Sequence, residues 1–440
     1  MTDPSLHRAD LSRKTDALAQ RLLERLTSEG ETADVVASPP GAGKTRLLVK
    51  LCVALAGQGK AIGVVCQTNQ QANDVAKRLV DETPQCPIVR FLGSSAPADD
   101  KIDGTLSVRK TSEFPVGKKV VIGTSAKWSL IGMCDVLDAL LVDEAWQMTF
   151  STFLPIMRFT GRFLIIGDPG QLPPVVTTPT ERWATSDMPP HVAAPEVLLR
   201  DGQIQLHQLP ATWRLPHDSA KAIAPFYDFA FESAAQPTER RFSRAGSGPL
   251  DDVERALNAL NDRSTSLLLV PSPASGTLAT GDRVVASAIV QTAVRALETG
   301  AVATSRDRAK PRNDILLPQD IGITTSRREM VRAIRDELPS ELRTQIRVDT
   351  AERWQGSECQ LMIIAHPLSS VRVPSEFDLA TGRLCVMASR HRCALVVVTR
   401  DHVPETLAGH MPSATQPLGQ SDTAGRGLFQ HRSFWEAISA

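Results

Sequence analysis

Two apolar runs of the chain each end abruptly in a cluster of polar residues. The run ALLV at 139–142 is followed by DEAWQ (143–147), and the run FLII at 163–166 is followed by GDPGQLPP (167–174). Short uninterrupted apolar runs are typical of strands buried in a parallel sheet. In an open α/β sheet, ligands bind in the crevice beyond the carboxyl ends of such strands. The two phrases therefore favour an α/β fold and predict where its chemistry lies.

A glycine-rich segment, SPPGAGKT (38–45), follows the apolar run ADVVA and precedes the helical pattern TRLLVKLCVALAG. Gly41 and Gly43 permit a close backbone approach, so the N–H groups around Ala42 would point at phosphate oxygens. Lys44 would reach the terminal phosphates, and the Thr45 hydroxyl would bind Mg²⁺. The helix dipole adds a positive end at the same place. The segment predicts a phosphate-binding loop, with Ser38 standing where the usual pattern has glycine.

Length and composition bound the class of protein. The chain has 440 residues, which suggests two to three domains, and 42% hydrophobic residues are ample for packed cores. Lys plus Arg and Asp plus Glu both number 49, so bulk charge gives no argument for a polyanionic partner. The seven cysteines lack metal-ligand spacing, which is typical of reduced structural thiols. The polar N-terminus and the lack of a membrane-spanning apolar run favour a soluble, cytoplasmic protein without a membrane partner.

Strand patterns alternate with helix patterns along the chain. The expected strands are ADVVA, AIGVVCQ, PIVRFL, VVIGTS, ALLVDE and FLIIGD in the first part, and SLLLV, DIGITT, IRVDT, QLMIIAH and ALVVVT in the second. The alternation favours parallel sheets with crossover helices. We expect an N-terminal helical segment at 1–33, a first α/β domain at 34–178, a connector at 179–204, a second α/β domain at 205–405, and a C-terminal tail and helix at 406–440. The phosphate-binding loop lies in the first domain, and the second has none. Two such cores suggest a nucleotide held in an interdomain cleft.

The second domain has residues that suit such a cleft. An arginine such as Arg214 or Arg390 would stabilise charge on the transferred phosphoryl group and make hydrolysis depend on domain closure. The phrase VDTAERWQGSE (348–358) adds the polar side chains of Gln355 and Glu358 and a close backbone approach at Gly356. Taken singly, an arginine is most often a solvated surface charge, and only the ordered set of phrases favours the catalytic role.

The ordered set of phrases resembles a known family, the superfamily 1 helicases, and within it the branch of the nonsense-mediated-decay RNA helicase and senataxin. The resemblance covers nearly the whole chain. The phrases that carry it are, in order, SPPGAGKT, QTNQQANDVAKRL, VVIGTSA, DEAWQ, GDPGQLPPVV, LPATWRLPHD followed by FY, DIGITTSRREM, VDTAERWQGSE and GRLCVMASRHR. It implies two tandem RecA-like parallel-sheet domains.

The resemblance also implies a role for each matching residue, with ATP and Mg²⁺ as cofactors. The residues it assigns to ATP are Gly41, Ala42, Gly43, Lys44, Thr45, Gln355, Gly356, Trp213 beside the adenine and Glu358 at the ribose. It assigns the metal to Thr45 and Asp143, the general base to Glu144, and the two arginine fingers to Arg214 and Arg390. It assigns phosphate sensing and coupling to Gln147, Asp168, Gln171 and Arg383.

Two of the nucleotide assignments have open alternatives. For Trp213 the alternative is a core position. Gln20 lies at a suitable distance before the loop to contact the adenine edge, but its surroundings match the family poorly.

For nucleic acid, the resemblance points to Thr68, Asn69, Thr124 and Thr350, all at predicted strand ends. Hydroxyl and backbone N–H groups can follow the phosphate backbone of a single strand without base contacts, so binding would tolerate any sequence and weaken with salt. The alternative for each threonine is a turn or helix cap. The expected partner is single-stranded DNA or RNA.

Several positions depart from the family. Cys385, Met387, Ser389 and His391 replace common choices in GRLCVMASRHR, and SRR follows DIGITT where the family commonly has Pro-Tyr-Arg. The first strand comes early in the chain and the gap between QTN and GTS is short, so neither place has room for a large accessory domain. We therefore expect a minimal motor, with a protein partner that would supply specificity or unwinding.

The C-terminal sequence HRSFWEAISA predicts a short amphipathic helix with Phe434, Trp435 and Ile438 on one side. We expect it to pack on the second core. A helix that docks a partner is the alternative.

Three functions remain open at this stage. The first is an ATP-driven translocase or helicase on single-stranded nucleic acid, moving 5′ to 3′. The second is a nucleic-acid-stimulated ATPase switch that remodels a complex without unwinding. The third is a P-loop ATPase unrelated to nucleic acid, which would leave the order of Thr350, Gln355 and Arg390 unexplained.

Overall fold

The computed structural model describes residues 4–82, 86–93, 102–114, 117, 119–132, 136–183, 185–200, 202–273, 278–307, 312–412 and 422–439. The chain divides into two compact units. The first unit comprises Ala9–Pro169 and Pro173–Pro210, and the second comprises Gly170–Leu172, Ala211–Ala440 and the first residues through Arg8. Among the described residues, no helix is both long and apolar enough to cross a membrane.

The first unit is built on an eight-stranded sheet in the order β4-β3-β5-β2-β6-β7-β1-β8. Every neighbouring pair in it is parallel. The strands are β1 (Thr32–Ala37), β2 (Ile62–Cys66), β3 (Ile88–Phe91), β4 (Thr105–Val108), β5 (Val120–Thr124), β6 (Ala139–Val142), β7 (Arg162–Gly167) and β8 (Gln205–Gln208). The six strands expected from apolar runs in the first domain are all present.

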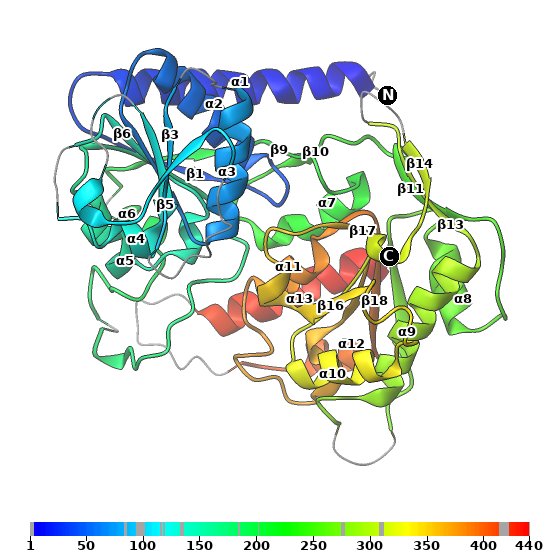
Figure 1. Ribbon diagram of the computed structural model, residues 1–440. Helices are drawn as coiled ribbons and strands as arrows, with labels where there is room; N and C mark the ends of the chain where they lie inside the picture. The colour runs from blue at the N-terminus through cyan, green and yellow to red at the C-terminus, as the bar shows by residue number, and fades with distance from the viewer. Residues whose placement is uncertain are drawn as a thin grey trace. The chain divides into compact units, whose positions relative to one another are not determined.

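Helices cover both faces of this sheet. They are α1 (Pro4–Thr27), α2 (Lys44–Gly57), α3 (Asn69–Glu82), α4 (Ser125–Trp128), α5 (Phe150–Met157) and α6 (Ala194–Leu198). Buried side chains of α1, α2 and α3 share one apolar cluster with alternate residues of the strands. Helices α4 and α5 lie apart from these three helices (Figure 1). Gly63 and Gly123 make room for Trp128 of α4, since a Cβ at either position would come within about 3.0–3.2 Å of its ring. Parallel strands need covered faces, and the two helix layers provide them.

One strand lies in a different unit from the one expected. The predicted second domain begins at residue 205, whereas β8 pairs with β1 at the edge of the first sheet. The physical reason is a buried carboxylate. Asp34 of β1 is fully buried and accepts hydrogen bonds from Arg25 of α1 at 2.7 and 2.9 Å, and it lies 2.8 Å from His207 of β8. This contact needs β8 beside β1, and the polar sequence QLHQ gave no apolar signal for it.

The second unit has a five-stranded parallel sheet in the order β12-β18-β17-β15-β16. Its strands are β12 (Thr265–Val270), β15 (Ile321–Thr325), β16 (Arg347–Thr350), β17 (Cys359–Ala365) and β18 (His391–Arg400). Its helices are α7 (His217–Ile223), α8 (Asp252–Ala259), α9 (Arg283–Glu298), α10 (Arg328–Glu337), α11 (Arg383–Ala388), α12 (Val403–Gly409) and α13 (Thr423–Ser439). The five strands match the five apolar runs expected there. With the first unit, they confirm an α/β fold of two RecA-like parallel-sheet domains.

Alternate residues of β17 and β18 face two separate apolar clusters. Ile363 and Val396 pack with α8, α9 and α10, whereas Ile364 and Val397 pack with α7, α11 and α13. The sheet is therefore buried on both faces, which explains why its strands are nearly continuous apolar runs.

Two small sheets of the second unit were not anticipated. One is antiparallel and consists of β11 (Arg240–Arg244), β13 (Ala301–Ser305) and β14 (Arg312–Ile315). The other pairs β9 (Ala211–Thr212) with β10 (Glu232–Ser233). Arginine-rich and two-residue strands have little apolar periodicity, so pattern analysis had no signal for them.

The C-terminal helix packs on the second core, as expected. Phe434 and Ile438 of α13 are fully buried in the cluster with α7 and α11, and Trp435 packs against a neighbouring cluster with Leu428. The Phe434 ring meets Phe226 edge to face at 6.2 Å. Because these apolar side chains are used inside the unit, the alternative of a docking helix is not supported.

We predict that Phe434→Ala lowers the free energy of unfolding of the second unit by about 3–5 kcal/mol, because it leaves a cavity where a large ring is fully buried. Phe429→Ala on the same helix is the matched control, since that ring is 61% exposed; its effect should stay within about 0.5 kcal/mol. Urea unfolding followed by circular dichroism measures both. Equal effects of the two variants would contradict the packing of α13.

Candidate nucleotide and nucleic-acid sites

The predicted phosphate-binding loop joins β1 to α2 in the first unit. Gly41 and Gly43 have φ angles of 68° and 87°, a left-handed conformation that glycine adopts without strain. Gly43 is the N-cap of α2, so the helix begins at Lys44 with its free N–H groups toward the loop. Ser38 is fully buried, and both its N–H and its hydroxyl donate to the carbonyl of Gly167, at 3.0 and 2.9 Å. Serine at this position therefore adds a hydrogen bond between the loop and the end of β7.

Four predicted residues meet at the carboxyl ends of β1 and β6. The Lys44 ammonium lies 3.2 Å from a Glu144 carboxylate oxygen. The Thr45 hydroxyl donates to a carboxylate oxygen of Asp143 at 3.5 Å. Glu144 has a φ of 52°, one of two left-handed non-glycine residues among those described. Such strain persists where the surrounding structure imposes it, and it is common at active sites.

The electrostatics of Asp143 suit a cation. Burial and the charge of Glu144 together raise the pKa of Asp143 to about 7, because Lys44 offsets them only in part. The pair of carboxylates thus has too little positive charge around it. A divalent cation held by the Thr45 hydroxyl and Asp143 would supply that charge, and oxygen donors of this kind are those Mg²⁺ prefers. The described residues contain no cluster of three or more metal-ligating side chains, which fits an ion held mainly by phosphate and water.

The predicted coupling residue Gln147 lies beside this group. Its amide donates to Glu144 at 3.4 Å. Gln67, which sequence analysis did not single out, donates to the backbone carbonyl of Asp143 at 3.3 Å and accepts from the Ser125 hydroxyl at 3.3 Å. Gln67 follows β2 and Ser125 follows β5, so a hydrogen-bonded path runs from the carboxylates across the sheet edge. The signal that could have found Gln67 was its place within QTN at a strand end.

The phrase GDPGQLPP divides between the two units. Asp168 is buried in the first unit after β7, whereas Gln171 belongs to the second. Gly382, the N-cap of α11 with a φ of 90°, packs on Gln171; a Cβ there would lie 2.4 Å from the Gln171 carbonyl oxygen. The structure thus brings Gln171 next to Arg383, the first residue of α11.

Three predicted nucleic-acid residues lie at neighbouring strand ends of the first unit. Thr68 and Asn69 follow β2, and Thr124 ends β5, which pairs with β2. The Thr68 hydroxyl accepts from the N–H of Gln71 at 3.2 Å, and the Thr124 hydroxyl caps α4 by accepting from Lys127 at 3.4 Å. The capping alternative is therefore real for both threonines. Thr68 is exposed and the other two are half-buried.

In the second unit, Arg214 is held in an ion pair. Its Nε donates to Glu358 at 3.0 Å and one terminal nitrogen donates to the Ser389 carbonyl at 3.4 Å. Arg392 pairs with the other oxygen of Glu358 at 2.6 Å. Burial alone would raise the pKa of Glu358, but the two arginine charges outweigh it and hold that pKa below its usual value. Arg214, Glu358 and the buried Ser389 therefore form one group.

The turn that carries Trp213 is fixed by its neighbours. The Thr212 hydroxyl accepts from the N–H of Arg214 at 3.3 Å, and Arg240 donates to the Trp213 carbonyl at 2.7 Å. Arg240 is itself held by Asp307 at 2.6 Å. The Trp213 ring is half-buried, unlike a core tryptophan.

Arg390 and Arg383 are both buried. The Arg390 Nε donates to the Val386 carbonyl at 3.1 Å. Arg383 donates to Glu352 at 3.1 Å and lies 3.9 Å from the Phe377 ring centre, and burial lowers its pKa.

The remaining predicted residues of the second unit lie at sheet edges. Gln355 and Gly356 precede β17, and Thr350 ends β16. The side-chain nitrogen of Gln355 is buried without a hydrogen-bond partner among the described residues, as expected of a group that awaits a ligand. Gly356 has a φ of 77°.

Among the described residues, no hydrogen bond joins Gln20 to a predicted site residue. It is exposed on α1 and donates to Glu24 at 2.9 Å.

Two of the residues that depart from the family pattern lie in the core of the second unit. Cys385 is fully buried 3.4 Å from the Tyr227 hydroxyl, and Met387 is fully buried in the same core. Six cysteines are free and five of these are buried, as expected of structural thiols; Cys134 lies outside the described residues.

Comparison with known proteins finds two family models along the chain. Residues 17–185 match a family described as an AAA domain, and residues 282–402 match a second family with the same description. The chain is also 23% identical over 154 residues to the DNA replication ATP-dependent helicase/nuclease DNA2 of Saccharomyces cerevisiae, a match that covers 32% of this chain and 10% of that protein. The chain thus spans about a tenth of the curated relative it matches.

Solved structures of arterivirus nonstructural protein 10, a helicase, are also similar. The protein alone is 14% identical with a TM-score of 0.45, covering 85% of this chain and 61% of that chain. Its complex with DNA is 15% identical with a TM-score of 0.44, covering 84% and 61%. Of the two AAA-domain matches, the first lies in the first unit apart from residues 170–172, and the second lies in the second unit.

Proposed function

We propose that this chain hydrolyses ATP with Mg²⁺ and uses the energy to move 5′ to 3′ along single-stranded nucleic acid. The observation that carries the proposal is a single sheet edge in the first unit. The ends of β1 and β6 bear Lys44, Thr45, Asp143 and Glu144 in mutual contact, and the ends of β2 and β5 bear Thr68 and Thr124. A nucleotide site and a backbone-binding site on one edge are what a motor needs.

In the proposed reaction, bound Mg²⁺ would supply positive charge beside the phosphates of ATP. Thr45 and Asp143 would hold the ion, and Lys44 would bind the terminal phosphates. Lys44 now pairs with Glu144. When Lys44 turns to phosphate, Glu144 would lose this ion pair and could accept a proton from the attacking water.

The second unit would supply charge to the transferred phosphoryl group. We propose Arg214 and Arg390 as the two arginine fingers, with Gln355 and Gly356 contacting phosphate. Trp213 would stack beside the adenine, Glu358 would bind the ribose, and Gln20 would contact the adenine edge. Two observations support these roles: the amide nitrogen of Gln355 has no hydrogen-bond partner in the described part of the chain, and the Trp213 ring is half-buried.

Coupling would run through Gln147, Asp168, Gln171 and Arg383. The support is local: Gln147 contacts the proposed base, and Gln171 packs beside the start of α11. Thr68, Asn69, Thr124 and Thr350 would contact the phosphate backbone of the strand. The motif set favours the branch of the nonsense-mediated-decay RNA helicase and senataxin, and we propose a cytoplasmic location.

A second candidate is an ATPase switch that remodels a complex without unwinding. Between β2 and β5, the described residues form only α3, β3, β4 and a short 3₁₀ helix, Thr111–Glu113. That is too little for a domain that splits a duplex. On either proposal, a protein partner would supply specificity or unwinding.

We predict that Glu144→Gln retains ATP binding and lowers kcat by about 10²–10⁴-fold, since the amide cannot accept a proton. Glu82→Gln, an exposed carboxylate at the end of α3, is the matched control and should keep full turnover. Phosphate release and equilibrium binding of a fluorescent ATP analogue measure the two effects. Normal turnover in Glu144→Gln would remove this residue as the base.

We predict that Arg390→Ala retains ATP binding and loses about 10³–10⁵-fold in kcat, the range for an arginine that stabilises the transferred phosphoryl group. Arg328→Ala, an exposed arginine at the start of α10, should turn over normally. Because Arg390 is buried, circular dichroism must first show that the variant is folded. Unchanged hydrolysis in a folded Arg390→Ala would rule out the finger.

We predict that single-stranded nucleic acid raises the ATPase rate, and that the stimulation weakens as salt increases. Parallel titrations with single-stranded DNA and RNA of one sequence identify the preferred strand. Thr68→Ala should weaken stimulation while leaving the basal rate unchanged. No stimulation by either strand would leave only an ATPase unrelated to nucleic acid.

Duplexes with 5′ or 3′ single-stranded tails then separate the two candidates. A translocase with the proposed polarity displaces the strand only when the tail is 5′. Stimulated hydrolysis without displacement from either substrate favours the switch.

A further inference from the structure

His391 is one of the departures from the family pattern, and it lies next to Arg390 in the chain. The His391 side chain is fully buried, and its Nε2 lies 2.7 Å from the Ser219 hydroxyl. The Ser219 hydroxyl lies 2.6 Å from the Ser264 hydroxyl. Ser264 in turn donates its hydroxyl to one oxygen of Asp218 at 2.5 Å and its N–H to the other at 2.7 Å. Four residues thus form one continuous hydrogen-bonded chain.

The direction of this chain follows from counting donors. An ionised carboxylate only accepts, so Ser264 donates its single hydroxyl hydrogen to Asp218. The Ser264 oxygen then accepts from Ser219, and the Ser219 oxygen accepts from His391. Burial lowers the pKa of His391 to about 3, so the ring is neutral and carries one N–H. With that hydrogen on Nε2, every link has one donor and one acceptor.

The chain joins the two segments that carry the proposed arginine fingers. Asp218 and Ser219 lie in α7, which begins three residues after Arg214. His391 begins β18 immediately after Arg390, and the Arg390 carbonyl accepts from the N–H of Cys359 at 3.0 Å. The backbone at Arg390 is therefore fixed on one side by β17 and on the other by the buried ring of His391.

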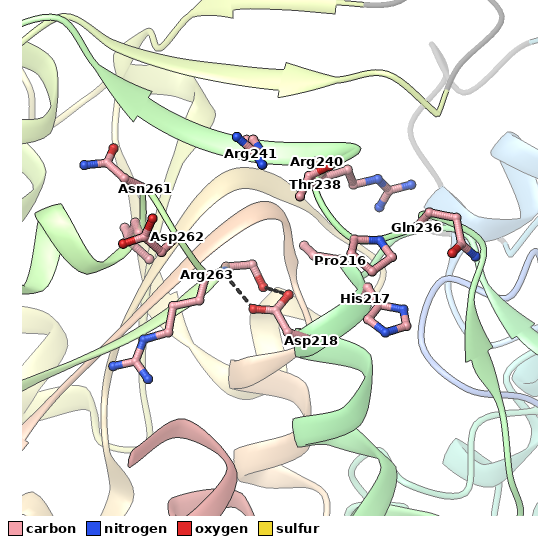
Figure 2. Close-up of a pocket in the computed structure, with 13 residues that line it drawn as sticks. Pro216, His217, Asp218, Gln236, Thr238, Arg240, Arg241, Asn261, Asp262 and Arg263 are labelled. Carbon is pink, nitrogen blue, oxygen red and sulfur yellow. Dashed lines mark hydrogen bonds between the residues drawn. The ribbon is translucent and has the colours of Figure 1, made fainter. Parts of the chain in front are cut away.

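The Asp218 end of the chain is accessible. Asp218 and Ser264 line a cavity of about 180 Å³ between the start of α7, β11 and the loop before β12. Figure 2 shows Asp218 facing this loop, with its hydrogen bonds drawn as dashed lines. The chain therefore runs from a cavity wall at Asp218 to the fully buried ring of His391.

We propose that His391, Ser219, Ser264 and Asp218 are positioning residues that hold Arg390 in the orientation needed for hydrolysis. This inference rests on the proposed role of Arg390 as a finger. A hydrogen-bonded His391 holds the backbone of its neighbour at one place and angle, and a shift of about 1 Å at a catalytic group can cost roughly a hundredfold in rate. The chain thereby ties the geometry of Arg390 to the segment that carries Arg214.

The first test removes one link. Ser219→Ala breaks the chain with the loss of a single oxygen, and we expect kcat to fall roughly ten- to a hundredfold while the Kd for ATP changes less than about twofold. Ser266→Ala is the matched control. Ser266 is also a fully buried serine of this unit, but its hydroxyl has no hydrogen-bond partner among the described residues. It should therefore keep the wild-type kcat.

The second test separates hydrogen bonding from packing. His391→Gln keeps an N–H donor near the position of Nε2, whereas His391→Phe keeps a buried ring and loses the donor. We expect His391→Gln to keep the larger share of kcat. A higher kcat in His391→Phe would overturn the proposal, because it would show that the ring acts only by filling space.

The third test asks whether the chain acts through Arg390. In an Arg390→Lys background, Ser219→Ala should lower kcat less than about twofold further, because two changes to one unit are not additive. The proposal would be overturned if Ser219→Ala lowered kcat by the same factor in the Arg390→Lys background as in the wild type. An unchanged kcat in Ser219→Ala, alongside a lowered one in Arg390→Lys, would overturn positioning and leave the finger in place. An unchanged kcat in Arg390→Lys would instead count against the finger itself, and positioning would fall with it.

Discussion

The carbonyl of Gly167 is the point on which the candidate nucleotide site depends. It accepts both the N–H and the hydroxyl of Ser38, in a sheet where Ala37 of β1 pairs with Gly167 of β7. The hydrogen bonds fix where the loop leaves β1 relative to the polar residues after β7. Lys44 and Thr45 follow at the start of α2, so their reach toward β6 is set by this anchor. Two hydrogen bonds to one buried carbonyl make the position of the loop rigid, and preorganised groups of this kind cost no rearrangement when charge develops.

Much of this arrangement was predictable from the sequence because it depends on local patterns. The apolar runs ALLV and FLII had to be buried strands, and parallel pairing brought their polar ends to one edge. The proximity of Asp143 and Glu144 to Lys44 and Thr45 therefore follows from local patterns, and no contact between distant residues is needed to predict it. The five strands of the second unit were found by the same signal.

Other features depend on contacts between residues far apart in the chain, and no local pattern reports them. Asp34 is fully buried because Arg25 and His207 surround it, and His207 lies 173 residues away. The polar strand β8 exists because of that contact. His391 likewise looked like a simple departure from the family until Ser219, 172 residues away, proved to be its partner. Buried polar residues need partners, but the sequence alone does not say which ones.

The charges of each unit are already paired within that unit, and this constrains how a nucleotide can bind. Lys44 pairs with Glu144 in the first unit, and Arg214 pairs with Glu358 in the second. A polyphosphate bound as we propose would have to exchange with these carboxylates, so its binding would cost more free energy than at a site of free cations. On the proposed mechanism the exchange would free Glu144 from Lys44 only when phosphate is present. Arg390 is buried, and its Nε donates to the backbone carbonyl of Val386. The place of that backbone therefore bears directly on the orientation of Arg390, and the hydrogen-bonded chain that begins at His391 acts there.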